Sequence, residues 1–181
     1  MKKILLMICC VMIAFSSSMA GTAKFGVGAF GGLNIPLVQD DQASGTVFGL
    51  AARMRVLPFM TAEPNATFGK WSQPDPIEDV EMPDGAKINS FGIDVLLGPS
   101  IGIVGFKPYG VVGAGSYKIK NDVGYDESNL GWSAGFGALI GLTPKFDLDI
   151  RGKFVAAPQD GDYTKKAVTV TVGAAFNLGA E

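Results

Sequence analysis

Residues 107–119 read Lys107-Pro108-Tyr109-Gly110-Val111-Val112-Gly113-Ala114-Gly115-Ser116-Tyr117-Lys118-Ile119. In an extended strand, successive side chains point to opposite faces. The odd positions are mostly apolar, with a tyrosine near each end, whereas the even positions are small or polar. Tyr109 and Tyr117 would lie roughly 20 Å apart along a membrane normal if the strand is tilted, close to the ~25 Å apolar band of a transmembrane β-barrel. This stretch therefore predicts a membrane-spanning strand whose odd face contacts lipid.

Seven other segments alternate in the same way and are separated by polar or turn-forming residues. These segments are 25–35, 47–56, 59–68, 87–97, 130–142, 145–155 and 167–178. The connections between the segments alternate long and short, beginning with a long one. Long extracellular loops and tight periplasmic turns are typical of outer-membrane barrels. The sequence thus predicts an all-β fold, an eight-stranded antiparallel up-and-down transmembrane β-barrel with short periplasmic turns and longer extracellular loops.

The first 20 residues have the pattern of a secretory signal peptide. Two lysines precede an apolar run over residues 4–15, and small residues follow at 18–20. This arrangement is typical of a segment that signal peptidase removes. We expect cleavage before Gly21, which leaves one barrel domain over residues 21–181. The alternative is a retained transmembrane anchor, but the apolar run is short for a membrane span.

Composition excludes several kinds of chemistry. The chain contains no histidine, and its two cysteines lie inside the predicted signal peptide. Histidine-based triads, Cys-His dyads, disulfides and thiolate metal sites are therefore excluded from the barrel. The formal charge of −2 becomes −4 when Lys2 and Lys3 are removed, which argues against nucleic-acid binding. We expect no enzymatic activity, no cofactor and no metal centre.

The inward faces of the predicted strands carry opposite charges. These residues are Arg53, Arg55, Glu63, Asp94, Asp147, Asp149, Arg151 and Lys153. Side chains just fill the interior of an eight-stranded barrel, and a buried charge is costly unless it is paired. We therefore expect a lumen filled by paired charges. The alternative is a wet lumen in which the same side chains are solvated.

Aromatic residues are predicted to form a girdle at the membrane surfaces. This girdle comprises Tyr109, Tyr117, Trp71, Trp132, Phe146, Phe154 and Phe176. The longest loop, residues 69–86, is acidic. Its carboxylates suggest a divalent cation site, but they lack calcium-loop spacing, and an acidic loop of this composition is more simply a solvated one.

Three stretches resemble small outer-membrane β-barrel proteins of Gram-negative bacteria. They are Phe25 to Pro36, Leu57-Pro58-Phe59, and Pro108-Tyr109 through Gly113-Ala114-Gly115. The family includes the transmembrane domain of outer membrane protein A and porin-family barrels. The resemblance implies an outer-membrane location, contact with outer-membrane lipids and lipopolysaccharide, and help from the barrel assembly machinery. Members of this family serve adhesion, structural anchoring or narrow pores.

Three function classes follow from these expectations. The first is a structural or surface-interaction barrel, with an adhesion-like role, whose exposed loops meet the environment. The second is a narrow, non-specific pore for small solutes. The third is a soluble, secreted barrel that carries a ligand, which would need polar outer faces that 130–142 and 167–178 do not supply.

Overall fold

The computed structural model describes residues 25–37, 43–72, 85–98, 104–120, 126–158 and 164–178. Within these ranges the chain forms eight β-strands and no helix. The strands are β1 (Phe25–Pro36), β2 (Ala43–Leu57), β3 (Met60–Ser72), β4 (Lys87–Leu97), β5 (Gly105–Lys120), β6 (Asp126–Thr143), β7 (Phe146–Pro158) and β8 (Thr164–Leu178). The predicted signal peptide lies outside the described residues. No helix in the ranges above is long and apolar enough to span a membrane.

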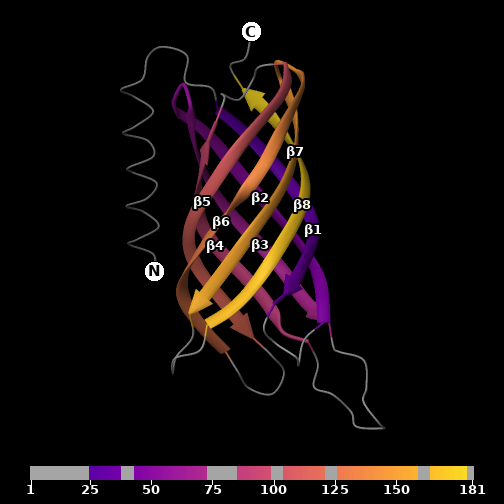
Figure 1. Cartoon of the computed structure of the whole chain (residues 1–181), viewed down its shortest axis with the longest axis vertical. Helices are drawn as coiled ribbons and strands as arrows, with labels where there is room; N and C mark the ends of the chain where they lie inside the picture. Colours follow the sequence, from indigo (N-terminus) through magenta and orange to yellow (C-terminus); the bar gives the residue numbers. More distant parts are fainter. Residues whose placement is uncertain are drawn as a thin grey trace.

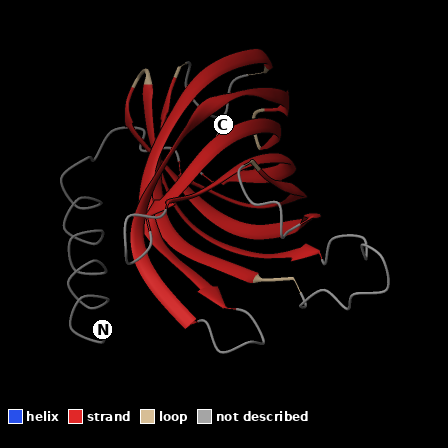
Figure 2. Ribbon diagram, turned by 60° about the horizontal axis from the view of Figure 1, so that its bottom comes forward, coloured by secondary structure: helices blue, strands red, loops and turns tan. Residues whose placement is uncertain are grey.

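The strands close into a single barrel. Each strand pairs antiparallel with its neighbours in sequence order, and β1 pairs with β8. Figure 1 shows the strands tilted around a common axis, and Figure 2 shows the same sheet curling into a closed ring. Closure leaves no strand edge, so the backbone groups are paired between strands, as a lipid environment requires. The predicted eight-stranded antiparallel barrel is confirmed.

The two ends of the barrel differ in their connections. The end that we call the turn end has the connections 58–59, 98–104 and 144–145 together with Phe25 and Leu178. The opposite end, the loop end, has the connections 37–42, 73–86, 121–125 and 159–163. Of the three turn-end connections, 98–104 is the longest. The loop-end strands continue further than predicted, since β6 begins at Asp126 and β8 at Thr164, and this shortens the loops.

The outer face is apolar and exposed. Phe136 is 80% exposed, Leu130 77% and Phe106 70%. Phe48, Phe68 and Phe91 form a contiguous aromatic patch, with ring centroids 5.5 and 6.0 Å apart. Water-exposed surfaces rarely present apolar area on this scale, whereas lipid requires it.

The orientation of β5 is opposite to the predicted one. Tyr109, Tyr117 and Ile119 are buried inside the barrel, with exposed fractions of 5%, 8% and 0%, whereas Val112 is 48% exposed on the outside. The prediction that the odd face contacts lipid is therefore wrong. The reason is that the interior also contains apolar layers, so apolar alternation alone does not identify the face that points to lipid.

Inward aromatic rings lie over glycines of neighbouring strands. Tyr109 faces Gly137 across the β5–β6 pair, and a Cβ atom added at Gly137 would collide with the tyrosine ring. A Cβ atom added at Gly131 would lie 2.8 Å from Cδ2 of Tyr117. The glycine-rich inner face of β6 therefore provides the space that these two rings occupy.

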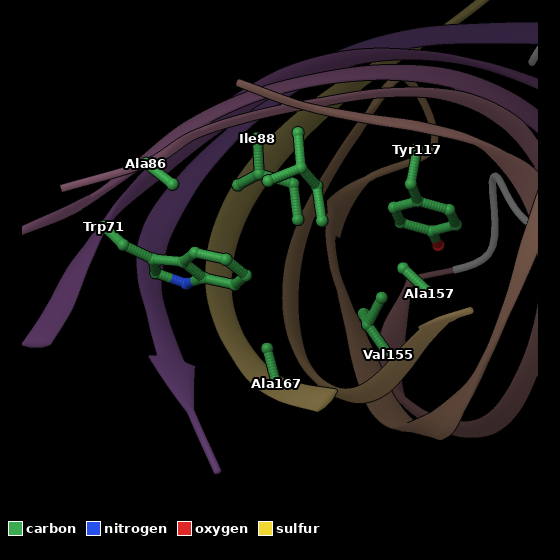
Figure 3. Close-up of a cluster of buried hydrophobic side chains, with 8 residues drawn as sticks. Trp71, Ala86, Ile88, Tyr117, Val155, Ala157 and Ala167 are labelled. Atoms are coloured by element: carbon green, nitrogen blue, oxygen red, sulfur yellow. The ribbon is translucent and has the colours of Figure 1, made fainter. Parts of the chain in front are cut away.

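The interior near the loop end contains an apolar cluster. It comprises Trp71, Ala86, Ile88, Tyr117, Ile119, Val155, Ala157 and Ala167. Figure 3 shows these side chains converging inside the barrel wall. A smaller group, made of Leu96, Tyr109, Val111 and Leu139, packs nearer the turn end on β4, β5 and β6. The interior is thus divided into apolar and charged layers.

Candidate functional site

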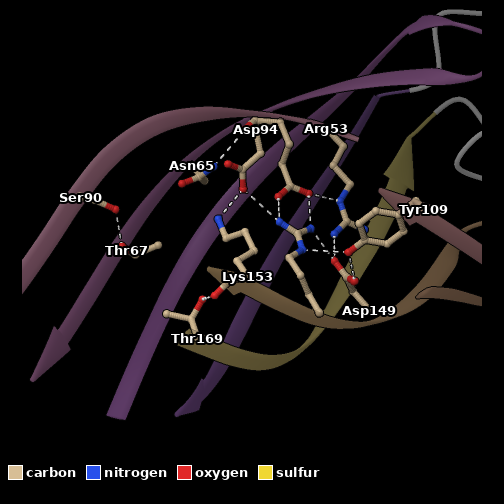
Figure 4. A network of polar contacts seen from close by, with 11 residues as sticks. Arg53, Asn65, Thr67, Ser90, Asp94, Tyr109, Asp149, Lys153 and Thr169 are labelled. Atoms are coloured by element: carbon tan, nitrogen blue, oxygen red, sulfur yellow. Dashed lines mark hydrogen bonds and ion pairs between the residues drawn. The ribbon is translucent and has the colours of Figure 1, made fainter. Parts of the chain in front are cut away.

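Six charged side chains meet in the middle of the barrel interior. This central cluster consists of Arg53 from β2, Glu63 from β3, Asp94 from β4, and Asp149, Arg151 and Lys153 from β7. Strand alternation points all of them inward, and the hydroxyl of Tyr109 on β5 joins them (Figure 4). Three cations face three carboxylates, so the central cluster is formally neutral.

Arg151 is the hub of the central cluster. Its Nη1 donates to Glu63 Oε1 at 2.6 Å, and its Nη2 donates to Glu63 Oε2 at 3.0 Å, which makes a bidentate pair. Nη1 and Nη2 also reach Asp94 and Asp149 at 3.2 and 2.7 Å. The remaining nitrogen, Nε, donates to Tyr109 Oη at 2.8 Å. A planar guanidinium with every nitrogen engaged holds three carboxylates in fixed positions.

The other two cations complete the pairing. Arg53 Nε donates to Glu63 Oε2 at 2.6 Å, and Arg53 Nη2 donates to Asp149 Oδ2. Lys153 Nζ donates to Asp94 Oδ2 at 2.6 Å. Tyr109 donates its own hydroxyl proton to Asp149 Oδ1 at 2.5 Å. Every carboxylate of the central cluster therefore accepts from a cation, and paired charges are the arrangement in which buried ions are tolerated.

A second ion pair lies nearer the turn end. Lys107 Nζ donates to Asp147 Oδ1 at 2.9 Å, and Asn177 Nδ2 donates to Asp147 Oδ2 at 2.7 Å. Sequence reasoning missed Lys107 because it assigned the odd face of β5 to lipid. The sequence does contain a signal for its inward position, because a lysine on the odd face of β5 argues against contact of that face with lipid.

Arg55 stands apart from both groups. It is half-buried, and no ion pair within the described ranges includes it. It lies beside a register shift between β2 and β3 that falls between Arg55 and Leu57. The structure thus brings together six of the predicted lumen charges in the central cluster and Asp147 with Lys107, but not Arg55.

The predicted aromatic girdle divides into two groups. Trp132 and Phe176 are exposed on the outer face, and Phe146 and Phe154 are partly exposed there. For Trp71, Tyr109 and Tyr117 the prediction is wrong, because these three rings are buried in the interior.

The predicted acidic loop, residues 69–86, includes Trp71, but β3 continues to Ser72 and places the indole of Trp71 in the loop-end cluster. Lys165 Nζ lies 5.9 Å from the centroid of this ring. Residues 73–84, which carry the loop's acidic groups, lie outside the described residues.

A cavity of about 40 Å³ separates the central cluster from the loop-end apolar cluster. Arg151 and Lys153 contribute to its lining, together with polar side chains that include Asn34, Thr67 and Ser90. Within the described part of the chain, the buried amide oxygen of Asn34 has no hydrogen-bond partner. The cavity has room for a few water molecules. Among the described residues, no cluster of three or more Asp, Glu, His or Cys suits a metal ion.

Comparisons with known proteins agree with this geometry. Residues 6–176 match the family described as outer membrane protein beta-barrel domain. The fold is similar to that of Neisserial surface protein A, at 17% identity and a TM-score of 0.68, over 85% of this chain and 97% of that chain.

Two further solved structures are similar. OprG, an outer membrane protein of Pseudomonas aeruginosa, has 12% identity and a TM-score of 0.61, over 87% of this chain and 96% of that chain. The attachment invasion locus protein Ail of Yersinia pestis, in complex with the heparin analogue sucrose octasulfate, has 15% identity and a TM-score of 0.52, over 87% of this chain and 100% of that chain. At these identities the likeness shows the fold alone. A search of curated proteins gives no match.

Proposed function

This chain belongs to the outer membrane protein beta-barrel domain family, and from that premise we propose that it is a non-conducting barrel with a structural or surface-interaction role. The resemblance predicted from the sequence is confirmed. The proposal includes export through residues 1–20, removal of that segment before Gly21, and insertion by the barrel assembly machinery. It assigns the contact with the surroundings to the loop end.

The central cluster is the observation that supports a closed lumen. Its ion pairs cross the interior from β7 to β2, β3 and β4. The interior of an eight-stranded barrel is only wide enough for its own side chains. An ion entering this layer would have to separate paired groups and leave buried charges without their partners, which is energetically costly. This cost favours a closed lumen over a conducting one.

A similar fold supports the surface-interaction part of the proposal. The structure of Ail, a protein named for attachment and invasion, contains a sulfated ligand. We extend from that example only the principle that a barrel of this size can present a recognition surface outside the membrane. The ligand of Ail is not assigned to this chain.

A narrow pore is the second candidate function. The cavity lined by Arg151 and Lys153 supports it, since this space lies directly beside the central cluster. Displacement of Lys153 alone, which is the more exposed cation at 14% side-chain exposure, would lengthen that space.

Conductance measurements distinguish the two candidates. We expect the full chain, exported and purified from outer membranes, to give no discrete current steps in planar bilayers under concentrated KCl. The reason is that every carboxylate of the central cluster is paired with a cation of the same cluster. Heat-modifiable gel mobility and co-flotation with liposomes would establish that the protein is folded and inserted.

Regular steps from inserted protein would overturn the closed-lumen proposal. If such steps changed ion selectivity in Arg53→Gln or Asp149→Asn but not in the control Arg55→Gln, the pore would run through the central cluster.

A further inference from the structure

Three lysines form a row across the outer face of the barrel near its loop end. Lys70 on β3 faces Lys87 on β4, and Lys87 faces Lys120 on β5. All three are exposed, and strand alternation turns them outward. Facing residues on paired strands have Cβ atoms only about 5 Å apart. The row therefore concentrates three positive charges within roughly 10 Å.

This arrangement is unfavourable without a counter-ion. Like charges directly opposite each other on paired strands destabilise a sheet. Within the described ranges, none of these three lysines forms an ion pair with a carboxylate. Asp126 on β6 lies opposite Lys120 and attracts it, but its ion pair, at 2.9 Å, is with Lys118. One carboxylate shared between two lysines leaves the row with a net positive charge. The row therefore presents a site for an anion that comes from outside the described barrel.

An aromatic patch lies directly on the membrane side of the lysine row. Phe68 lies two residues before Lys70 on the same face of β3, about 7 Å closer to the turn end. Phe68 stacks on Phe48 and meets Phe91 edge-on, with ring centroids 5.5 and 6.0 Å apart. Phe48 and Phe91 are 62% and 61% exposed. Cations above and aromatic rings below match a molecule with anionic head groups and hydrocarbon chains.

The position of the row within the membrane identifies the leaflet. In outer-membrane barrels the longer loops face outside, so the loop end lies at the outer leaflet. Lysine side chains can lay their hydrocarbon stems along apolar surface and raise the ammonium to the head-group level. The lysine row and the aromatic patch therefore belong to the outer-leaflet half of the barrel.

We propose that Lys70, Lys87 and Lys120 bind the phosphate groups of lipopolysaccharide, whose acyl chains pack on Phe48, Phe68 and Phe91. This site rests on the outer-membrane location and is independent of whether the lumen conducts. It also explains why three lysines are kept opposite one another, because the bound phosphates remove the repulsion.

The test uses the full chain, exported, purified in a neutral detergent and titrated with fluorescently labelled lipopolysaccharide. Each lysine near an anionic membrane surface contributes about a factor of five in binding. The triple variant Lys70→Gln, Lys87→Gln, Lys120→Gln should therefore bind roughly a hundredfold more weakly. The matched control, Lys145→Gln with Lys166→Gln, also removes exposed lysines but away from the row, and should bind like the wild type.

Two additional probes separate the phosphate and acyl contributions. Enzymatically dephosphorylated lipopolysaccharide should bind the wild type as weakly as the intact molecule binds the triple variant. Phe91→Ser should weaken binding of intact lipopolysaccharide but leave binding of its deacylated form unchanged. Equal affinity for lipopolysaccharide and for phosphatidylglycerol would overturn the proposal, since it would reduce the row to general attraction for anionic lipid.

Unfolding in lipid-free detergent distinguishes a binding role from a structural one. The triple variant should be as stable as the wild type or slightly more so, because the repulsion between its strands is removed. Added lipopolysaccharide should then stabilise the wild type but not the triple variant. A loss of stability without lipid would show that the lysines are neutralised by carboxylates of this chain, and the lipid site would be wrong.

Discussion

Replacement of Arg151 with alanine is expected to lower the free energy of unfolding by about 3–5 kcal/mol, the range found when one partner of a buried ion pair is removed. Arg151 is 6% exposed and serves Glu63, Asp94 and Asp149 at once. Without it, three carboxylates share two cations in a confined interior. Glu63, which is fully buried, loses its bidentate partner.

Urea-induced unfolding in detergent micelles, followed by tryptophan fluorescence and by heat-modifiable gel mobility, measures this loss. Arg55→Ala is the matched control, because it removes an arginine from the inward face of β2 that has no ion pair within the described ranges. We expect Arg55→Ala to change the unfolding free energy by no more than about 0.5 kcal/mol.

A double-mutant cycle with Glu63→Ala shows whether the pair itself carries the effect. Removing both partners takes away the unpaired charge, so the double variant should cost less than the sum of the two single variants. If Arg151→Ala and Arg55→Ala unfold at the same urea concentration, the charges of the central cluster are solvated, and the alternative of a wet lumen is correct.

Strand alternation predicted the outer faces of β6 and β8 because lipid requires an unbroken apolar face there. Leu130, Phe136 and Val172 satisfy this requirement and are exposed. On β5 the same rule failed, since the interior also needs apolar side chains at Val111 and Ile119. Alternation identifies two faces, but it does not say which face points to lipid when both environments accept apolar groups.

The glycines of β6 indicate which face of β5 points into the barrel. Tyr109 and Tyr117 need space on a neighbouring strand, and Gly137 and Gly131 provide it only if both rings point inward. Reading β5 against β6 requires the register between the two strands. Register depends on the side-chain patterns of both strands and on the connection between them, so no single segment specifies it.

The contacts within the central cluster could not be predicted from the sequence for a similar reason. Inward charges could be found by elimination, because an apolar outer face leaves charged residues only the interior. The partner of each charge could not, since Arg53 and Asp149 are 96 positions apart and meet only through the stagger of the closed sheet. The predicted set of lumen charges omits Lys107 because the predicted orientation of β5 is wrong. The same set includes Arg55, although the register shift beside Arg55 ends the regular ladder between β2 and β3.

Replacement of Gly137 with valine is expected to destabilise the barrel by about 3 kcal/mol, at the upper end of the range for overpacking a core. The added Cβ would collide with Cζ and Oη of Tyr109 and would lie 2.8 Å from the backbone oxygen of Ile150. Tyr109 cannot move aside without cost, because its hydroxyl bridges Arg151 and Asp149 at 2.8 and 2.5 Å. The same urea titration in micelles measures the loss.

Gly110→Val is the matched control for this substitution. Gly110 lies on β5, one residue from Tyr109, and an added Cβ there meets nothing within 4 Å. Valine is also favoured in strands, so we expect no loss of stability. In a Tyr109→Ala background, Gly137→Val should lose most of its effect, because the ring that it displaces is gone. If the effect is undiminished in that background, glycine is necessary at this position because of the contact with the Ile150 backbone. The space occupied by the Tyr109 ring is then not the reason.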